Sequence, residues 1–309
     1  MGASQEEIIG RNKWYRLGEL LTRLVKEKPL GTLGGIIVLV FLTVGIFADL
    51  IAPYGYNEFD LSARLSPPSS EHILGGDSLG RDLLSRIVYG ARISLYVGLA
   101  AAGLTASAAT IIGTISGFYG GKTDAIIQRF VDAFMCFPAM FLYLTLMAVV
   151  GPGIGQVIMV LGTIEGVRQS RVVRSAVIGI KGLQYVEAAK AIGANPIIIL
   201  TRHILPNILA PIIIIFTVFT AHMIIREATL SFLGFGVPPP IPTWGGMLSQ
   251  GGRHYMIKAP WLAVWPGLAL AVVVYGINML GDAMRDILDP RLRGNAGRYG
   301  GTKAKKRIK

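Results

Sequence analysis

One pentapeptide has the residue types and spacing of a hydrolase nucleophile. Gly76-Asp77-Ser78-Leu79-Gly80 matches G-x-S-x-G, in which the serine occupies a sharp turn between a strand and a helix. His254 could lie on the same side of a membrane, but the segment 53–90 has no room for the α/β sheet that this turn needs. We instead expect Asp77 to cap an amphipathic stretch at the outer membrane surface, and keep a membrane-bound serine hydrolase as an alternative. The apolar residues of that stretch are Leu79, Leu83, Leu84, Ile87 and Val88.

Neither a nucleotide site nor a metal site is indicated elsewhere. Residues 116–123 (SGFYGGKT) differ from a P-loop by one residue, but they follow an apolar helix rather than a strand, so we interpret them as a turn. Cys136 is the single cysteine, and the histidines do not form a ligand pattern. No cofactor is therefore expected in this chain. The histidines are His72, His203, His222 and His254.

Glu165, Arg168 and Arg226 fall within or beside apolar segments, where an ionised group costs about 2.5 to 3.5 kcal/mol on insertion scales. Glu165 lies roughly 16 Å beyond Ile154 at about 1.5 Å per residue, near the middle of a bilayer, and Arg168 follows on the same helical face. We hypothesise that this pair lines a path for a charged or zwitterionic solute; the alternative is a pair that faces a partner subunit. Arg226 is predicted near the outer edge, either snorkelling to headgroups or at the outer mouth.

The composition is that of an integral membrane protein. Of 309 residues, 52% are hydrophobic and 16% are charged, and the mean hydropathy is +0.55. This is too apolar for a soluble protein with one core. The 30 Lys and Arg residues exceed the 18 Asp and Glu residues and give a net charge of +12, which has to be explained separately.

Six apolar stretches qualify as transmembrane helices, so we predict an all-α integral membrane protein with six spans. The stretch 154–166 is the weakest, since its purely apolar part ends at Ile164. Pro138 and Pro211 are expected to break the third and fifth spans. The predicted spans are 32–51, 93–118, 130–150, 154–166, 208–233 and 261–280.

The basic residues sort to one side of the predicted spans. Of the 30 Lys and Arg residues, 23 fall in the arm, the turn after span two, the segment after span four and the tail. The positive-inside rule therefore places both termini in the cytoplasm. The basic tail from Arg291 onward is interpreted as a cluster beside anionic lipid of the bilayer rather than a nucleic-acid-binding arm.

The segment 167–206 is far longer than a connector between helices of a bundle needs to be. Residues 183–192 (LQYVEAAKAI) favour a helix, and Gly193 is placed to end it. Asn195 and Pro196 are a cap and first-turn proline for a second helix over 197–204, which should close before Pro206. The sequence thus predicts a short helical hairpin, 183–206, on the cytosolic face.

The hairpin resembles a known family, the membrane subunits of binding-protein-dependent ABC importers. Glu187-Ala188-Ala189, Gly193 and Leu205-Pro206 reproduce the EAA signature of that family with its usual spacing. The similarity covers about residues 30 to 293, and further motifs resemble the C-type permease subunits of dipeptide, oligopeptide and nickel importers. These motifs are 74–95 (LGGDSLGRDLLSRIVYGARISL), 202–207 (RHILPN), 227–237 (EATLSFLGFGV), 242–248 (PTWGGML) and 289–293 (DPRLR).

The resemblance implies a type I ABC importer permease fold with a cytosolic EAA coupling helix. Glu187, Ala188, Ala189, Gly193, Leu205 and Pro206 would form the surface that docks on a cytosolic ATPase, whereas a local interpretation of Glu187 is a surface pair with Lys190. Glu227 falls in the EA-x-LSFLG element of the family, which favours a structural or gating role beside the path.

The resemblance also implies partners: a homologous permease subunit in a heterodimer, two ATP-binding subunits that hold the ATP and Mg²⁺, and an extracytoplasmic solute-binding protein. The chain itself would not be an enzyme, and it would lie in a bacterial or archaeal cytoplasmic (inner) membrane. The solute would be a peptide or a related small molecule such as a nickel chelate or glutathione. A secondary transporter is the other alternative function.

These predictions divide the chain into a basic cytoplasmic arm (1–31), a first transmembrane helix with an outer loop (32–92), a five-helix permease core (93–284) and a basic cytoplasmic tail (285–309).

Overall fold

A computed structural model describes residue 22 and residues 24–288, and nearly all regular structure in this part is helical. An isolated bridge between Gly76 and Asp82 is the single β-type pairing there. Most of the predicted basic arm and tail lies outside the described residues. The long helices are α3 (Pro29–Ile46), α5 (Leu83–Tyr119), α6 (Gly121–Cys136), α7 (Ala139–Val150), α8 (Ile154–Lys181), α11 (Leu209–Phe232) and α14 (Trp261–Leu288).

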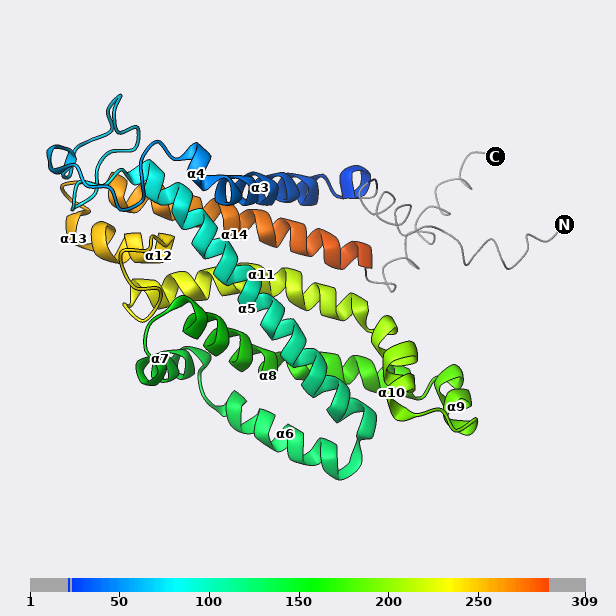
Figure 1. The fold of residues 1–309 in the computed structure, drawn as a ribbon. Coiled ribbons are helices and arrows are strands. Elements are labelled where there is room, and N and C mark those ends of the chain that lie inside the picture. Colours follow the sequence, from blue (N-terminus) through cyan, green and yellow to red (C-terminus); the bar gives the residue numbers. More distant parts are fainter. Residues whose placement is uncertain (1–21, 23, 289–309) are drawn as a thin grey trace, which may run out of the picture.

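Short helical segments occupy the two ends of the bundle (Figure 1). We call the end with residues 52–82 the loop end and the end with residues 183–206 the hairpin end. The loop end holds α4 (Ala48–Ile51), η1 (Leu61–Ala63), α12 (Trp244–Met247), η4 (Leu248–Gly252) and α13 (Arg253–Tyr255). The hairpin end holds α9 (Gln184–Ala191), α10 (Pro196–Ile198), η2 (Ile199–Ile204) and η3 (Leu205–Asn207).

Four described helices, α3, α5, α11 and α14, are long and apolar enough to cross a membrane. The pair α6 and α7 also qualifies when taken together, although it is bent by 91° at the break that contains Pro138. Helix α8 has 28 residues, about 42 Å at 1.5 Å per residue, but several charged residues interrupt its apolar character. The all-α membrane fold is confirmed, whereas apolar length supports four or five spans rather than the predicted six.

Several predicted boundaries are wrong. Span two begins ten residues earlier than residue 93, because the capped stretch after Asp82 continues directly into α5. Helix α8 continues to Lys181, so the part of the segment 167–206 that precedes the hairpin is almost entirely helix. Pro211 lies in the first turn of α11 and does not break it, since the first N–H groups of a helix have no partner within it.

Helix α5 is the centre of the bundle and packs most extensively against α8. Small residues make this close approach possible: a Cβ atom on Gly113 would lie 2.5 Å from the carbonyl oxygen of Ser170. On the other side of α5, a Cβ atom on Gly98 would lie 2.4 Å from a side-chain carbon of Ile224 in α11. These glycines therefore allow α5 to lie close to both neighbouring helices.

Helices α3 and α14 pack together beside this centre (Figure 1). Lys28, just before α3, forms an ion pair of 2.6 Å with Asp286 near the end of α14. Helix α3 therefore begins, and helix α14 ends, on the same side of the bundle, at the hairpin end (Figure 1).

The loop end is held together by carboxylates that cap chain turns. Asp82, not the predicted Asp77, caps α5, and its Oδ2 accepts hydrogen bonds from the N–H and the hydroxyl of Ser85 at 2.7 Å each. Asp77 instead caps the preceding turn, where its Oδ1 accepts from the N–H groups of Leu79 and Arg81. Hydrogen bonds from Ser62 hold the pKa of Asp60 below its usual value.

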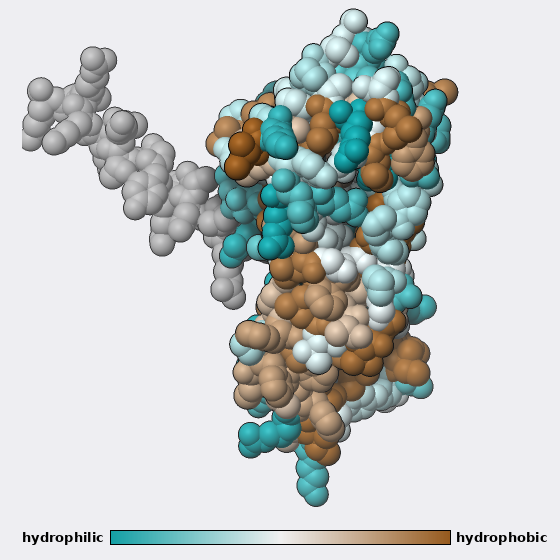
Figure 2. All heavy atoms as spheres, turned by 90° about the vertical axis from the view of Figure 1, so that its left-hand side faces the viewer, coloured by the Kyte–Doolittle hydropathy of each residue, from teal (hydrophilic) through white to brown (hydrophobic). Residues whose placement is uncertain are grey.

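Figure 2 views the molecule from the loop end and shows that hydrophilic residues gather on the upper part of this face. The lower part is mostly hydrophobic. Large exposed apolar side chains on α6 and α7 include Phe130, Phe141 and Val149. A patch of this kind on a membrane protein fits contact with lipid or with another subunit.

Candidate functional site

The hairpin end projects beyond the bundle as two short helical arms (Figure 1). Helix α9 covers 184–191, in agreement with the predicted helix over 183–192. Val186 and Ala189 are buried in a cluster that includes Val177 of α8 and Ile204 of η2. The apolar face of α9 therefore anchors the hairpin on the bundle and leaves the opposite face in contact with solvent.

Gly193 ends α9 in the way that its position predicted. Its φ angle of +77° lies in the left-handed region that favours glycine. The N–H of Gly193 donates to Lys190 O at 2.9 Å, and the N–H of Ala194 donates to Ala189 O at 3.0 Å. This is the hydrogen-bond pattern of a Schellman motif, and it fixes the direction in which the chain leaves α9.

The second arm begins as predicted but does not end as predicted. The side chain of Asn195 accepts from the N–H of Ile197 at 2.9 Å, and Pro196 is the first residue of α10. The chain then passes through a π-helical segment, η2, and a 3₁₀ turn that contains Leu205 and Pro206. Pro206 is therefore inside this turn rather than beyond the helical end, and α11 follows two residues after Asn207.

The exposed face of the hairpin combines an acidic and an apolar surface. Glu187 and Ala188 are exposed on α9, whereas Ala189 faces the bundle. Ile192 is 84% exposed and Ile197 is 65% exposed. Within the described part of the chain Glu187 forms no ion pair, so the surface pair with Lys190 is not present. An unpaired carboxylate beside exposed isoleucines has the composition of a contact surface.

A second candidate site lies inside the bundle, around Glu165 of α8. Its side chain is 4% exposed, and its Oε2 lies 2.8 Å from Nη1 of Arg226 in α11. The hydroxyl of Tyr143 in α7 donates to the same oxygen at 2.8 Å, and Gln169 donates to Oε1 at 3.1 Å. Arg168 is at a longer distance, with Nε 4.0 Å from Oε2. We call these five residues the Glu165 cluster.

The structure corrects the predicted place of Arg226. Its side chain pairs with Glu165 and so does not snorkel to headgroups, and its guanidinium lies over the rings of Tyr143 and Phe219 at 5.6 and 5.8 Å. Tyr143, Gln169 and the aromatic contacts were not predicted. The signal for Tyr143 was its hydroxyl in an otherwise aliphatic helix, since a buried tyrosine usually finds a hydrogen-bond partner.

Two further arginines of α8 have partners of their own on α6. Arg171 forms an ion pair with Asp132, and Arg174 donates to Asp124 Oδ1 from Nε at 2.6 Å. The hydroxyl of Ser116, at the end of α5, also bonds to Asp124. These two arginines are therefore tolerated on α8 because α6 supplies carboxylates at the matching positions.

Both candidate sites fall within one family match. A family model for the inner membrane component of binding-protein-dependent transport systems matches residues 109–294, which is more than half of the chain. The chain belongs to this family. A second model, the N-terminal transmembrane domain of oligopeptide transport permease C, matches residues 19–68. The predicted C-type family is thereby confirmed, and the chain is a permease subunit of an ABC importer.

Curated relatives agree with this assignment, and a solved structure has the same fold. The dipeptide transport system permease protein DppC of Alkalihalophilus pseudofirmus is 40% identical over 87% of this chain and 88% of that relative. The glutathione transport system permease protein GsiD of Escherichia coli O6:K15:H31 is 39% identical over 92% of each. A chain of the inward-facing MetNI methionine ABC transporter shares the fold, with a TM-score of 0.52, 17% identity, and coverage of 66% of this chain and 96% of that chain.

Glu227 of the permease does not join the Glu165 cluster. It is fully buried, accepts a hydrogen bond from Ser231 at 2.7 Å and lies 3.4 Å from the hydroxyl of Ser94 in α5. Thr243, which caps α12, also bonds to its side chain. Glu227 thus joins α5, α11 and the start of α12 through neutral donors.

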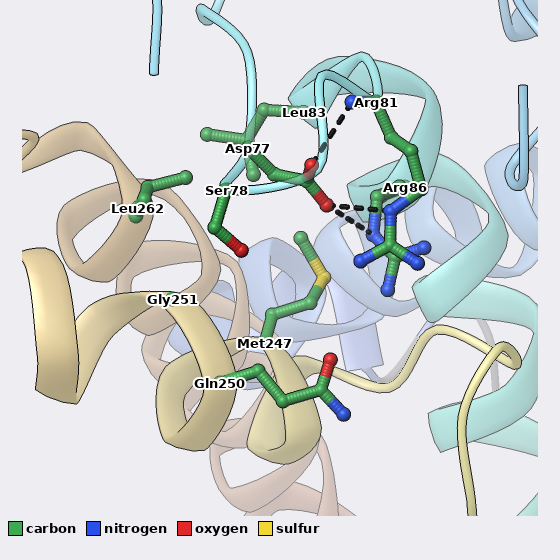
Figure 3. Close-up of a pocket in the computed structure, with 9 residues that line it drawn as sticks. All are labelled: Asp77, Ser78, Arg81, Leu83, Arg86, Met247, Gln250, Gly251 and Leu262. Carbon is green, nitrogen blue, oxygen red and sulfur yellow. Dashed lines mark hydrogen bonds and ion pairs between the residues drawn. The ribbon is translucent and has the colours of Figure 1, made fainter. Parts of the chain in front are cut away.

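The two segments that resemble enzyme motifs lie in a loop and in a turn between helices of the permease. Ser78 lines a small pocket with Asp77, Arg81 and Arg86, and none of the nine lining residues is a histidine (Figure 3). Figure 3 also shows the ion pairs from Asp77 to Arg81 and Arg86. The P-loop-like segment is the turn between α5 and α6, with Gly120 at a φ of +68°.

Proposed function

We propose that this permease subunit imports peptides or a related small solute, such as glutathione or a nickel chelate, with energy from ATP hydrolysis on partner subunits. The projecting hairpin, with exposed Glu187 and Ile192, is the observation that carries the proposal. The peptide class is supported by the names of the relatives, which include a dipeptide and a glutathione permease protein.

The hairpin is proposed to dock on a cytosolic ATPase. Glu187, Ala188 and the exposed isoleucines would contact the ATPase, while the buried Ala189 and the turn at Leu205 and Pro206 connect the contact to α8 and α11. Because Gly193 fixes the exit direction of α9, a movement of the ATPase would be transmitted to the bundle as a rigid-body displacement.

The complete importer would contain a homologous permease, two ATPases that bind ATP and Mg²⁺, and an extracytoplasmic solute-binding protein. In this arrangement the hairpin end lies in the cytoplasm with both termini, and the loop end faces the binding protein. The excess of basic residues on the hairpin side supports this orientation. Glu165, Arg168 and Arg226 would line the translocation path, while the sealed Glu227 would join helices beside it.

The test uses the reconstituted importer and two substitutions in the hairpin. Glu187→Lys reverses the exposed charge, and Gly193→Pro forbids the left-handed φ angle and removes the N–H that bonds to Lys190. Both variants should insert normally, fail to retain the ATPases on purification and show uptake at background level.

Glu71→Lys is the matched control, because Glu71 is an exposed carboxylate at the opposite end of the bundle. It should retain the ATPases as the unmodified chain does. Retention of the ATPases and normal uptake by Glu187→Lys would contradict the docking role. Uptake that persists when both ATPases are inactivated would instead favour a secondary transporter.

A further inference from the structure

We infer that the Glu165 cluster is a recognition site for the carboxylate of the transported solute, in which Arg168 binds the solute and Glu165 occupies the site between transport events. This inference rests on the proposed function, because it places the cluster on the translocation path. It narrows the solute class to molecules with a free carboxylate, such as a peptide with an unmodified C-terminus.

The first argument is the balance of charge along α8. Arg171 and Arg174 each have a carboxylate on α6, namely Asp132 and Asp124. In the Glu165 cluster one carboxylate faces two guanidinium groups, which leaves an excess of one positive charge. An unpaired charge inside a membrane protein is costly, so the excess indicates a missing anionic partner.

The second argument identifies Arg168 as the group that lacks the partner. Arg226 lies 2.8 Å from Glu165, whereas the nearest nitrogen of Arg168 lies 4.0 Å away. Nη1 of Arg168 is buried and forms no hydrogen bond to the described residues. Nη1 of Arg226 also forms no hydrogen bond to these residues, but it lies within the 2.8 Å ion pair with Glu165, which Arg168 lacks. A buried guanidinium nitrogen without an acceptor has lost its hydration without replacement, which a carboxylate oxygen would correct.

The third argument concerns access and geometry. The side chains of Arg168 and Arg226 are each about a quarter exposed, at 24% and 25%, so both remain reachable from outside the cluster. His222, one turn from Arg226 on α11, is exposed beside Phe219. The rings of Tyr143 and Phe219 hold the Arg226 guanidinium in place. A guanidinium group can bind a carboxylate through two parallel hydrogen bonds, which a lysine cannot do.

These contacts allow Arg168 to exchange Glu165 for the solute carboxylate as its ionic partner, with no covalent step. In the state described here Glu165 neutralises Arg226 and part of Arg168. A solute carboxylate that reaches the cluster would bind Arg168 and restore neutrality. Because Glu165 also attracts Arg168, it would weaken solute binding enough for the solute to leave.

The experiment compares dipeptides with a free C-terminal carboxylate and their C-terminal amides in the reconstituted importer. The solute-binding protein is saturated with each form, so that the maximal rate reports transfer through the membrane subunits. The unmodified importer should transport the free acids about tenfold faster, the size expected for one charge-assisted hydrogen-bonded pair. Arg168→Gln should bring the ratio of the two rates close to one.

Arg171→Gln is the matched control, because it removes an arginine from the same helix whose partner is Asp132. It should keep the ratio of the unmodified importer. Arg168→Lys retains the charge without the paired nitrogens and should give an intermediate ratio. Glu165→Gln, which removes the internal competitor, should lower the concentration of loaded binding protein that gives half the maximal rate.

An unchanged ratio in both Arg168 variants would overturn the inference, and so would equal rates for the two forms in the unmodified importer. These outcomes differ from failure of the proposed function. If the proposed function were wrong, uptake would not depend on the ATPases or on Glu187. If only the carboxylate inference were wrong, ATP-driven uptake would continue and only the expected preference for the carboxylate, or its dependence on Arg168, would be missing.

Discussion

Two glutamates lie buried in the helix bundle, and their surroundings are opposite. Glu165 faces two arginines, a tyrosine and a glutamine, and its neighbours Arg168 and Arg226 remain partly exposed. Glu227 is fully enclosed, and its described hydrogen-bond partners are the hydroxyl groups of Ser94, Ser231 and Thr243. The first glutamate belongs to a charged site with access from outside, whereas the second joins three elements.

Burial alone does not distinguish a carboxylate with a functional role from one with a structural role. Both carboxylates are almost inaccessible, but only the partners of Glu165 can exchange one anion for another. Neutral hydroxyl donors satisfy Glu227 without an ion, so its site has nothing to offer a charged solute. The partners of a buried charge, rather than its depth, therefore indicate its role.

The largest expected effect is that of Glu227→Lys. A cation at this enclosed position would be buried without a counter-charge, which costs several kcal/mol. We expect the variant to be absent from the folded, membrane-inserted fraction after purification in mild detergent. Glu227→Gln is the control, because its amide keeps the size and can still accept from Ser231; it should accumulate normally. Normal accumulation of the lysine variant would show that Glu227 is not needed to hold α5, α11 and α12 together.

A smaller but still large effect is expected for Glu165→Ala. This change leaves the Arg226 guanidinium and the Tyr143 hydroxyl without their acceptor, at a cost on the order of 2 kcal/mol, since the arginines are partly exposed. The measurement is a double-mutant cycle of Glu165→Ala and Arg226→Ala on the free energy of unfolding in detergent. The arginine substitution should rescue part of the loss. A coupling energy of zero would mean that the 2.8 Å pair does not stabilise the protein.

Local features of the hairpin could be predicted from the sequence. Gly193, Asn195 and Pro196 act on hydrogen bonds within a few residues, so their types alone indicate where α9 ends and where α10 begins. The far end of the second arm was predicted wrongly, because the π-helical and 3₁₀ turns before α11 depend on packing of Ile199 and Ile204 against the bundle. The membrane class could be predicted from composition, because mean hydropathy does not depend on which residues are in contact.

Contacts between distant helices could not be predicted. The length of α8 was underestimated because Arg171 and Arg174 were assigned to a loop, while their partners on α6 are about 40 to 50 residues away. Arg226 was misplaced for a related reason: its depth was counted from the start of one helix and that of Glu165 from the start of another. Only the packing of α8 against α11 shows that the two residues lie at the same level.

The smallest effects are expected when one hydroxyl donor is removed from each buried glutamate. Tyr143→Phe removes a donor at 2.8 Å from Glu165 but keeps the ring beside Arg226, so it should cost about 1 kcal/mol. Ser94→Ala removes a longer contact of 3.4 Å to Glu227, where Ser231 and Thr243 remain, and should cost a few tenths of a kcal/mol. The free energies of unfolding of both variants, measured in the same detergent, test this difference. Tyr143→Phe should also lower the preference for free-acid dipeptides, because Glu165 would lose the hydrogen bond from Tyr143 and could compete more strongly with the solute for Arg168. Ser94→Ala should leave that preference unchanged. If Ser94→Ala changed the preference as well, the two glutamates would act as one site rather than two.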